Sequence, residues 1–337
     1  MNFNGIESIV KLSALYQARS RLQWSRPFND CSEMKELFRN IGYNLEVHQI
    51  TNGRLFGWFD IVQAGAALHV CISSNQALIF IGNASKNYLN FSIEKGHIGE
   101  YTKCQGIDLK KHSIFGFCTK TDEHFFAVSP GSRIHHLCVP KTLVIDMVNN
   151  LYGIQGIVFM EQNHTCQLSK ESHYELRSLM DEARFMPSDK IHTKLFVKIL
   201  DAIFQRDVKV RETVASSDLV KQFIRDATKF GGPKPLTVAD IAAQLFTSKT
   251  TLSDHLKQLT GVSPSAFLEM AYLEQARGAL MNPSDRRNVR QIAKDFGLGT
   301  RFSAKYLKKY GESPSVTKVR CQPIQLVASG LHAHLNP

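Results

Sequence analysis

The sequence lacks the segments that mark membrane and secreted proteins. No stretch approaches the roughly 18–20 consecutive apolar residues that a membrane-spanning helix needs. Residues 1–20 also lack the basic start, apolar block and small-residue cleavage site of a secretory signal. We therefore expect a cytoplasmic protein with no membrane partner.

Cysteine is present but lacks the spacing of a cross-linked or zinc-binding protein. The seven cysteines are odd in number, scattered and never arranged as CxxC; they lie at positions 31, 71, 104, 118, 138, 166 and 321. This pattern argues against a disulfide framework or a structural zinc site, and for a reducing compartment. We expect buried structural thiols; redox sensing is the less favoured alternative.

Positive charge is in excess, and its placement is uneven. The chain of 337 residues has 41 Lys and Arg against 30 Asp and Glu, a net charge of +11. Residues 211–320 hold 18 of the basic and 10 of the acidic residues, which is +8 of that excess. Either a solvated basic surface or a surface that docks on phosphates would explain this bias.

Residues 45–140 have the pattern of an antiparallel β structure. Short runs rich in β-branched and aromatic residues, such as LEVHQI, ALHVCIS, QALIFIG and HFFAVS, alternate with turn residues at a spacing of about ten. The pattern predicts a sandwich or barrel of cupin-like form. Before it, residues 1–44 show helical spacing; the apolar positions are Ile9, Leu12, Leu15, Tyr16, Met34, Leu37, Phe38 and Ile41.

Helical periods return from residue 141 onward. Two apolar stripes stand out, one at Leu176, Leu179, Met180 and Ala183, the other at Leu195, Ile199, Ala202 and Ile203. Residues 205–216 are polar and lack a period, and only helices are expected beyond them. The predicted organisation is an α+β N-terminal domain over 1–206 (β core about 45–140, helices 171–206), a linker 207–216, an all-α domain 217–320 and a tail 321–337.

The all-α domain contains an internal repeat. LSDHLKQLTGVSPS at 252–265 matches FSAKYLKKYGESPS at 302–315, and VADIAAQLF at 238–246 matches VRQIAKDFG at 289–297. Each copy reads as a short helix, a tight turn and a second helix, which is a helix-turn-helix unit. We call residues 238–260 the first unit and residues 289–311 the second unit; a joining helix is expected over 264–282.

The second helix of each unit has an apolar face and a polar face. The apolar positions are Leu252, Leu256 and Leu259 in the first unit and Phe302, Tyr306 and Tyr310 in the second. The polar face could donate to phosphates and base edges in the DNA major groove. We predict DNA contacts from Ser248, Lys249, Thr250, Thr251, Ser253 and Lys257, and from Thr300, Arg301, Lys305 and Lys308.

Residues 217–317 resemble the DNA-binding domain of AraC/XylS-type transcriptional regulators. The motifs are IAAQLFTSKTTLSDHLKQLTGVSPSAFL, YLEQARGALM and IAKDFGLGTRFSAKYLKKYGESPS. The resemblance implies sequence-specific binding of promoter DNA by both units, usually for activation and with RNA polymerase as a partner. It also implies a small-molecule-sensing β domain followed by dimerising helices, and hence a homodimer.

The sequence departs from the family pattern at several positions. The family often has Arg after the Ser of each recognition helix, where this chain has Asp254 and Ala304; its usual small turn residue is Phe246 here. The turn GLGTRFS of the second unit is about two residues shorter than usual. We expect the first unit to discriminate sequence and the second to supply affinity.

Enzymatic chemistry finds little support in the sequence. We find no G-x-S-x-G, P-loop, HExxH or GxGxxG motif, and IHH at 134–136 lacks the HxH spacing of a metal cupin. We expect no catalytic residue, metal or cofactor. The alternative function is a cupin-like metalloenzyme fused to a nucleic-acid-binding domain.

A small-molecule effector would need an apolar pocket in the β region. Trp58, Phe80 and Phe91 are the candidates to line it, although such aromatic residues are more often simply core. The stripes at 171–206 could pack on the sheet or against a second subunit. The sequence specifies neither the effector nor the operator.

Overall fold

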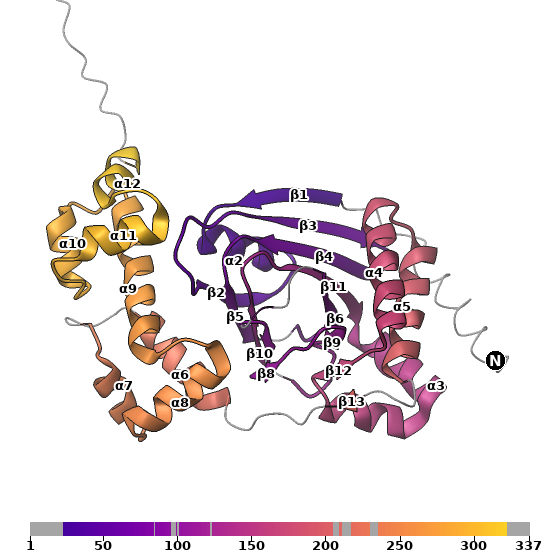
Figure 1. Cartoon of the computed structure of the whole chain (residues 1–337). Helices are drawn as coiled ribbons and strands as arrows, with labels where there is room; N and C mark the ends of the chain where they lie inside the picture. Colours follow the sequence, from indigo (N-terminus) through magenta and orange to yellow (C-terminus); the bar gives the residue numbers. More distant parts are fainter. Residues whose placement is uncertain are drawn as a thin grey trace, which may run out of the picture.

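A computed structural model of the chain describes residues 23–321, except positions 84, 96–98, 100, 122, 205–208, 211–216 and 230–234. The helical pattern expected at 9–16, most of the expected linker and the tail after Cys321 lie outside the described residues. Within them, two antiparallel sheets are followed by a helical region with two helix-turn-helix units (Figure 1). This arrangement confirms the predicted fold class.

Both sheets are antiparallel throughout their described pairings. The larger sheet contains, in spatial order, β1 (Gln23–Phe28), β3 (Gly57–Ala64), β4 (Ala67–Ser74), β11 (Arg133–Pro140), β6 (Tyr88–Glu94), β9 (Ser113–Phe115), β12 (Thr165–Gln167) and β13 (Lys209–Val210). The smaller sheet contains β2 (Asn44–Gln49), β5 (Leu78–Asn83), β10 (Glu123–Val128), β7 (Lys103–Cys104) and β8 (Ile107–Asp108).

The strand β1 was not expected from the sequence. Helical spacing was predicted over 1–44, but of the described residues there only α2 (Cys31–Arg39) is helical, and β1 pairs with β3. Trp24 stacks on Phe59 at 5.7 Å between ring centroids, and Phe28 is fully buried. β1 lies at the edge of the sheet among the described strands, a position at which proline such as Pro27 is tolerated.

Alternation along β5 places the smaller sheet between two apolar layers. Leu78 and Phe80 face the cluster between the two sheets, whereas Ile79 and Ile81 face the helices on the outer side. This period of two is the expected geometry of a strand that is buried on both faces. The smaller sheet therefore joins the β region to the C-terminal helices.

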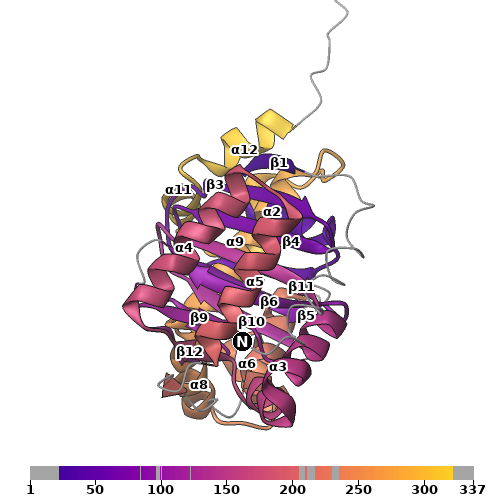
Figure 2. The ribbon, with the colours of Figure 1, turned by 90° about the vertical axis from the view of Figure 1, so that its right-hand side faces the viewer.

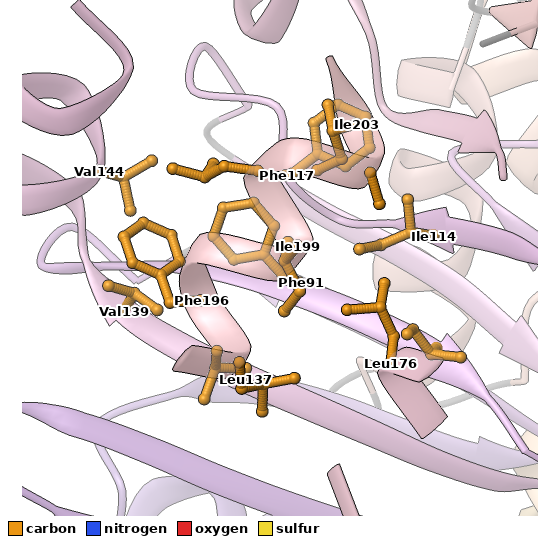
Figure 3. Packing of buried hydrophobic residues seen from close by; sticks show 14 of the residues in the cluster. Phe91, Ile114, Phe117, Leu137, Val139, Val144, Leu176, Phe196, Ile199 and Ile203 are labelled. Carbon is orange, nitrogen blue, oxygen red and sulfur yellow. The ribbon is translucent and has the colours of Figure 1, made fainter. Parts of the chain in front are cut away.

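Three helices cover the outer face of the larger sheet: α3 (Lys141–Gln162), α4 (Lys170–Phe185) and α5 (Asp189–Ile203) (Figure 2). The predicted stripes of α4 and α5 are buried there, as expected. They pack with Phe91 and Leu137 of the sheet (Figure 3). Because these stripes are buried in the core, any contact with a second subunit has to use other surfaces.

The helix α3 bears on the expectation that the chain has no membrane-spanning segment. Among the described residues, α3 is the single helix that is long enough and apolar enough, by length and composition alone, to cross a membrane. At Gly153 the backbone leaves the helical region (φ 66°, ψ −164°), so neither part reaches the roughly 20 residues of a span. Val144, Met147 and Val148 are buried in the core, which is how a helix that covers a sheet behaves.

The C-terminal region contains α6 (Ser217–Thr228), α7 (Val238–Gln244), α8 (Lys249–Thr260), α9 (Pro264–Met281), α10 (Val289–Asp295), α11 (Phe302–Tyr310) and α12 (Pro314–Cys321). Residues of α6 to α9 share one apolar cluster with the outer face of the smaller sheet. Residues of α9, α10 and α11 form a second cluster that contains no strand residue. The first unit thus packs on the sheet, and the second has a core of its own.

Candidate nucleic-acid interface

The first unit is shaped by caps that its sequence supplies. Thr237 and Asp240 form a reciprocal capping box at the start of α7. The Ser248 side chain accepts a hydrogen bond from the Thr251 amide at 3.0 Å and starts α8. Gly261, at φ 74°, ends α8 in the left-handed conformation. An N-cap of this kind contributes about 1 kcal/mol to stability, so both helices begin at defined residues.

The helix α8 presents the polar face that the sequence predicted. Its anchor positions Leu252, Leu256 and Leu259 are buried, as expected. The exposed positions at its start and on its opposite face are Ser248, Lys249, Thr250, Thr251 and Lys257, with Ser253 partly exposed. Asp254 is exposed as well and places one negative charge among them.

The polar residues of α8 divide into two groups. The hydroxyls of Ser248 and Thr251 lie 2.8 Å apart and serve the cap of the helix. Lys249 and Lys257 form no ion pair with any described residue. The two ammonium groups are therefore available to phosphates and base edges.

The second unit has a shorter recognition helix. Asn288 and Gln291 form a capping box at the start of α10, but α11 has only 9 residues against 12 in α8. Thr300 and Arg301, expected on the recognition helix, lie in the turn before it and are exposed. The reason is local: Arg301 is the N-cap residue, and its side chain makes no cap hydrogen bond.

The basic side chains of α11 are largely engaged within the protein. Lys305 forms an ion pair with Glu269 of α9. Lys309 is buried, and its Nζ donates to the Gln49 carbonyl of β2 at 3.2 Å. Lys308 is exposed and has no ion-pair partner among the described residues. Phe302, Tyr306 and Tyr310 are buried, as expected.

The helix α9 connects the cores of the two units. Its N-terminal half contributes Phe267, Leu268 and Ala271 to the cluster of the first unit. Its C-terminal half contributes Leu273, Ala276 and Leu280 to the cluster of the second. Eighteen residues at ~1.5 Å per residue give about 27 Å. Successive turns of B-DNA lie about 34 Å apart, so one helix of this length suits two neighbouring groove segments.

An ionisable cluster joins the second unit to the β region. His48 Nδ1 lies 3.3 Å from Glu274 Oε2 of α9. Burial acts to raise the pKa of the Glu274 carboxyl, but the hydrogen bond and charge of His48, and then the charge of Lys309, hold it below its usual value. Burial lowers the pKa of Lys309, and the charge of Glu274 opposes that shift. A cavity of about 190 Å³ adjoins this cluster, with Arg277 and Tyr310 in its lining.

The three candidate effector residues lie in different layers. Trp58 is 44% exposed, Phe80 is buried between the two sheets, and Phe91 is buried beneath the helices. A cavity of about 40 Å³ lies between the sheets. Phe126 lines this cavity and stacks on Phe80 at 4.3 Å between ring centroids, so Phe80 is one ring away from it. Sequence reasoning missed Phe126, although it alternates with buried residues along its strand.

The histidines and cysteines of the β region are mostly buried. His69 Nε2 lies 3.1 Å from His135 Nδ1, and burial lowers the pKa of His135 to about 3, so its ring is neutral. Six of the seven cysteines are buried, as expected, and burial raises the pKa of Cys104 to about 12. Within the described ranges, no group of three His, Cys, Asp or Glu residues is arranged to hold a metal ion.

Comparison with known proteins bears mainly on the C-terminal region. A family model described as a helix-turn-helix domain matches residues 241–320. Among solved structures, the AraC-like transcriptional activator CuxR is 14% identical, with 75% of this chain and 95% of that chain covered and a TM-score of 0.40. ToxT from Vibrio cholerae O395, bound to (E)-4-(8-methylnaphthalen-1-yl)but-3-enoic acid, is 10% identical, with 90% and 100% covered and a TM-score of 0.27.

The match to the family model covers both units of the repeat. That match spans α7 from Ile241 through α12. It includes both recognition helices and the joining helix α9 between them. Residues 241–320 therefore match a helix-turn-helix domain, in agreement with the two units that the structure shows.

Proposed function

We propose that this protein is a transcription regulator that binds promoter DNA sequence-specifically through both helix-turn-helix units. One observation carries the proposal: two such units share a single 18-residue helix, and the first presents a capped recognition helix whose lysines have no ion-pair partner in the part of the chain that the structure describes. Lys249 and Thr250 stand at the start of α8, the part of a recognition helix that meets base edges. Lys257, two turns further along, is placed for the phosphate backbone.

The two units have different parts in this proposal. The first discriminates sequence, through Lys249, Thr250 and their neighbours. The second supplies affinity, through Lys308 and the exposed Arg301 in the turn before α11. Lys305 contributes less because Glu269 holds its charge.

The β region is proposed as the regulatory part of the chain. An apolar effector would enter between the sheets beside Phe126 and Phe80, where a cavity already exists. Because that cavity is about 40 Å³, far below the roughly 300 Å³ of typical ligand pockets, binding requires side chains such as Phe126 to move. Trp58 and Phe91 line other layers and are secondary candidates.

We take activation through contact with RNA polymerase in the cytoplasm as the mode of action. A homodimer is proposed through outward residues of α4 and its end, where Tyr174, Phe185 and Met186 are exposed. Four recognition helices would then suit paired operator sites.

Genome-wide mapping of bound DNA followed by binding measurements tests the proposal. The wild-type protein should bind mapped promoter fragments at least 100-fold more tightly than random duplexes of equal length, within the range of specific regulators. Equal affinity for both duplexes would contradict a sequence-specific regulator.

A further inference from the structure

The turn of the first unit contains an unusual backbone conformation. Phe246, between α7 and α8, has φ +52°, and the residue at the same place in the second unit, Gly297, has φ +65°. The surrounding hydrogen bonds also match, from the Thr247 amide to the Ala242 carbonyl at 3.0 Å and from the Leu298 amide to the Ala293 carbonyl at 2.9 Å. The same helix ending is thus built once on glycine and once on phenylalanine.

Phenylalanine is a poor choice for this conformation. A left-handed backbone brings Cβ close to the following carbonyl oxygen, which is why glycine predominates at such helix ends. The Phe246 side chain is 98% exposed, so packing within the protein does not offset the strain. Gln105, another non-glycine residue with positive φ, is buried and donates to the Glu123 carbonyl at 2.7 Å. A strained and exposed aromatic residue points to a role outside the fold.

The position of Phe246 identifies the partner. It lies two residues before Ser248, the N-cap of α8, so their Cα atoms are at most about 7.6 Å apart. In helix-turn-helix complexes the first residues of the recognition helix meet base edges, which puts the preceding turn at the edge of the groove. Thymine methyl groups and deoxyribose carbons are the apolar surfaces available there.

We propose that Phe246 is a DNA-contact residue of the first unit, with its ring packed against the apolar surface of the duplex at the groove edge. The inference rests on the DNA binding proposed above and adds a contact that depends on apolar burial instead of charge. It also explains why the first unit carries a strained residue where the second has glycine.

The substitution Phe246→Gly separates this role from a structural one. Because it removes the ring and the backbone strain together, the melting temperature should stay the same or rise. The affinity for a mapped promoter duplex should fall roughly five- to thirty-fold, as expected for losing much of the burial of one aromatic side chain. The salt dependence of binding should not change, because no phosphate contact is lost.

Two further variants serve as controls. Phe246→Ala removes the ring but keeps a Cβ in the left-handed conformation. It should therefore bind promoter DNA as weakly as Phe246→Gly and melt at a lower temperature than Phe246→Gly. Ile154→Ala removes an apolar side chain that is 66% exposed on α3 and should leave DNA affinity unchanged. Duplexes with single thymine-to-deoxyuridine changes locate the contact. If a change lowers the affinity of wild-type protein but not that of Phe246→Gly, the ring contacts the thymine methyl group at that position. If no change has this effect, the ring packs against deoxyribose.

The outcomes distinguish this inference from the proposed function. If wild-type protein prefers promoter duplexes and Phe246→Gly binds them with wild-type affinity, the inference is wrong and the proposed function stands. If that variant keeps its affinity but loses promoter activation in a reporter strain, Phe246 contacts a protein, which also overturns the inference. If wild-type protein shows no preference among duplexes, the proposed function itself fails.

Discussion

The first unit has a recognition helix of 12 residues that begins at a side-chain cap, whereas the second has one of 9 residues without such a cap. Lys249 and Lys257 of the first unit have no ion-pair partner among the described residues. In the second unit, Lys305 is paired with Glu269 and Lys309 is buried against Gln49. Two copies of one sequence pattern therefore present different surfaces.

The difference shows that repeated anchor positions do not imply repeated polar surfaces. Both copies keep their apolar anchors, because each helix must bury one face to fold. The residues on the other face are free to change. The first unit retains side chains suited to base edges, whereas two of the three lysines of α11 in the second unit make contacts within the chain.

The largest expected difference concerns charge removal. Replacing Lys249 and Lys257 with Ala should weaken promoter binding by tens-fold, because a base contact and a phosphate contact are lost together. The matched change of Lys305 and Lys308 to Ala should weaken promoter binding less, because Lys305 is already paired and only the phosphate contact of Lys308 is lost. Each double variant should reduce the slope of log affinity against log salt by about 0.9, the contribution of one phosphate contact. Equal losses of promoter affinity in the two double variants, measured by titration at several salt concentrations, would break the comparison.

Lys309 should give the second unit a pH dependence of stability in the alkaline range. Lys309 occupies the repeat position of Leu259, and burial lowers its pKa in the folded protein. Between that lowered value and the unfolded value near 10.4, the unfolded chain binds more protons, so this group makes stability rise with pH by up to about 1.4 kcal/mol per unit.

The variant Lys309→Leu isolates this effect because it gives the second unit the residue that the first already has. The free energy of unfolding in urea should increase from pH 8 to pH 10 more for wild-type protein than for the variant. If the difference in the free energy of unfolding between the two proteins stays constant with pH, Lys309 does not titrate as described.

Capping provides a test of stability alone. Ser248→Ala should lower the free energy of unfolding by about 1 kcal/mol, because the Thr251 amide loses its acceptor. Arg301→Ala at the equivalent cap should change it by no more than a few tenths, since that side chain makes no cap hydrogen bond. Thermal or urea unfolding measures both, and comparable losses would contradict the difference between the caps.

The smallest expected effect comes from releasing a lysine. Lys305 and Glu269 are each about 40% exposed (38% and 42%), so their pair contributes only a few tenths of a kcal/mol. Glu269→Gln should raise promoter affinity about two-fold and steepen the salt slope by up to about 0.9. Glu175→Gln, which breaks a similarly exposed pair with Lys198 on α4 and α5, controls for the loss of negative charge. If promoter affinity rises equally in both variants, the released Lys305 does not contact DNA.

The sequence predicted what depends on local spacing. The anchors Leu252, Leu256 and Leu259 follow from helical periodicity, as do the stripes of α4 and α5. Thr300 and Arg301 were expected on the recognition helix, but α11 starts after them, at Phe302. This start was missed because the cap that sets it depends on one side chain. The pairing of Lys309 with Gln49 was missed because the two residues are 260 positions apart. One signal for the burial of Lys309 was available in the sequence, because the repeat aligns it with Leu259, which was predicted to be buried.

The most direct test of the division between the units is the ratio of affinities for a mapped promoter duplex and a random duplex at fixed salt. We expect Lys249→Ala to lower this ratio by roughly 5- to 150-fold, the 1–3 kcal/mol of one specific contact. Lys308→Ala should weaken binding to both duplexes equally and leave the ratio unchanged. The opposite result, with the ratio lost in Lys308→Ala and kept in Lys249→Ala, would contradict the assignment of sequence reading to the first unit.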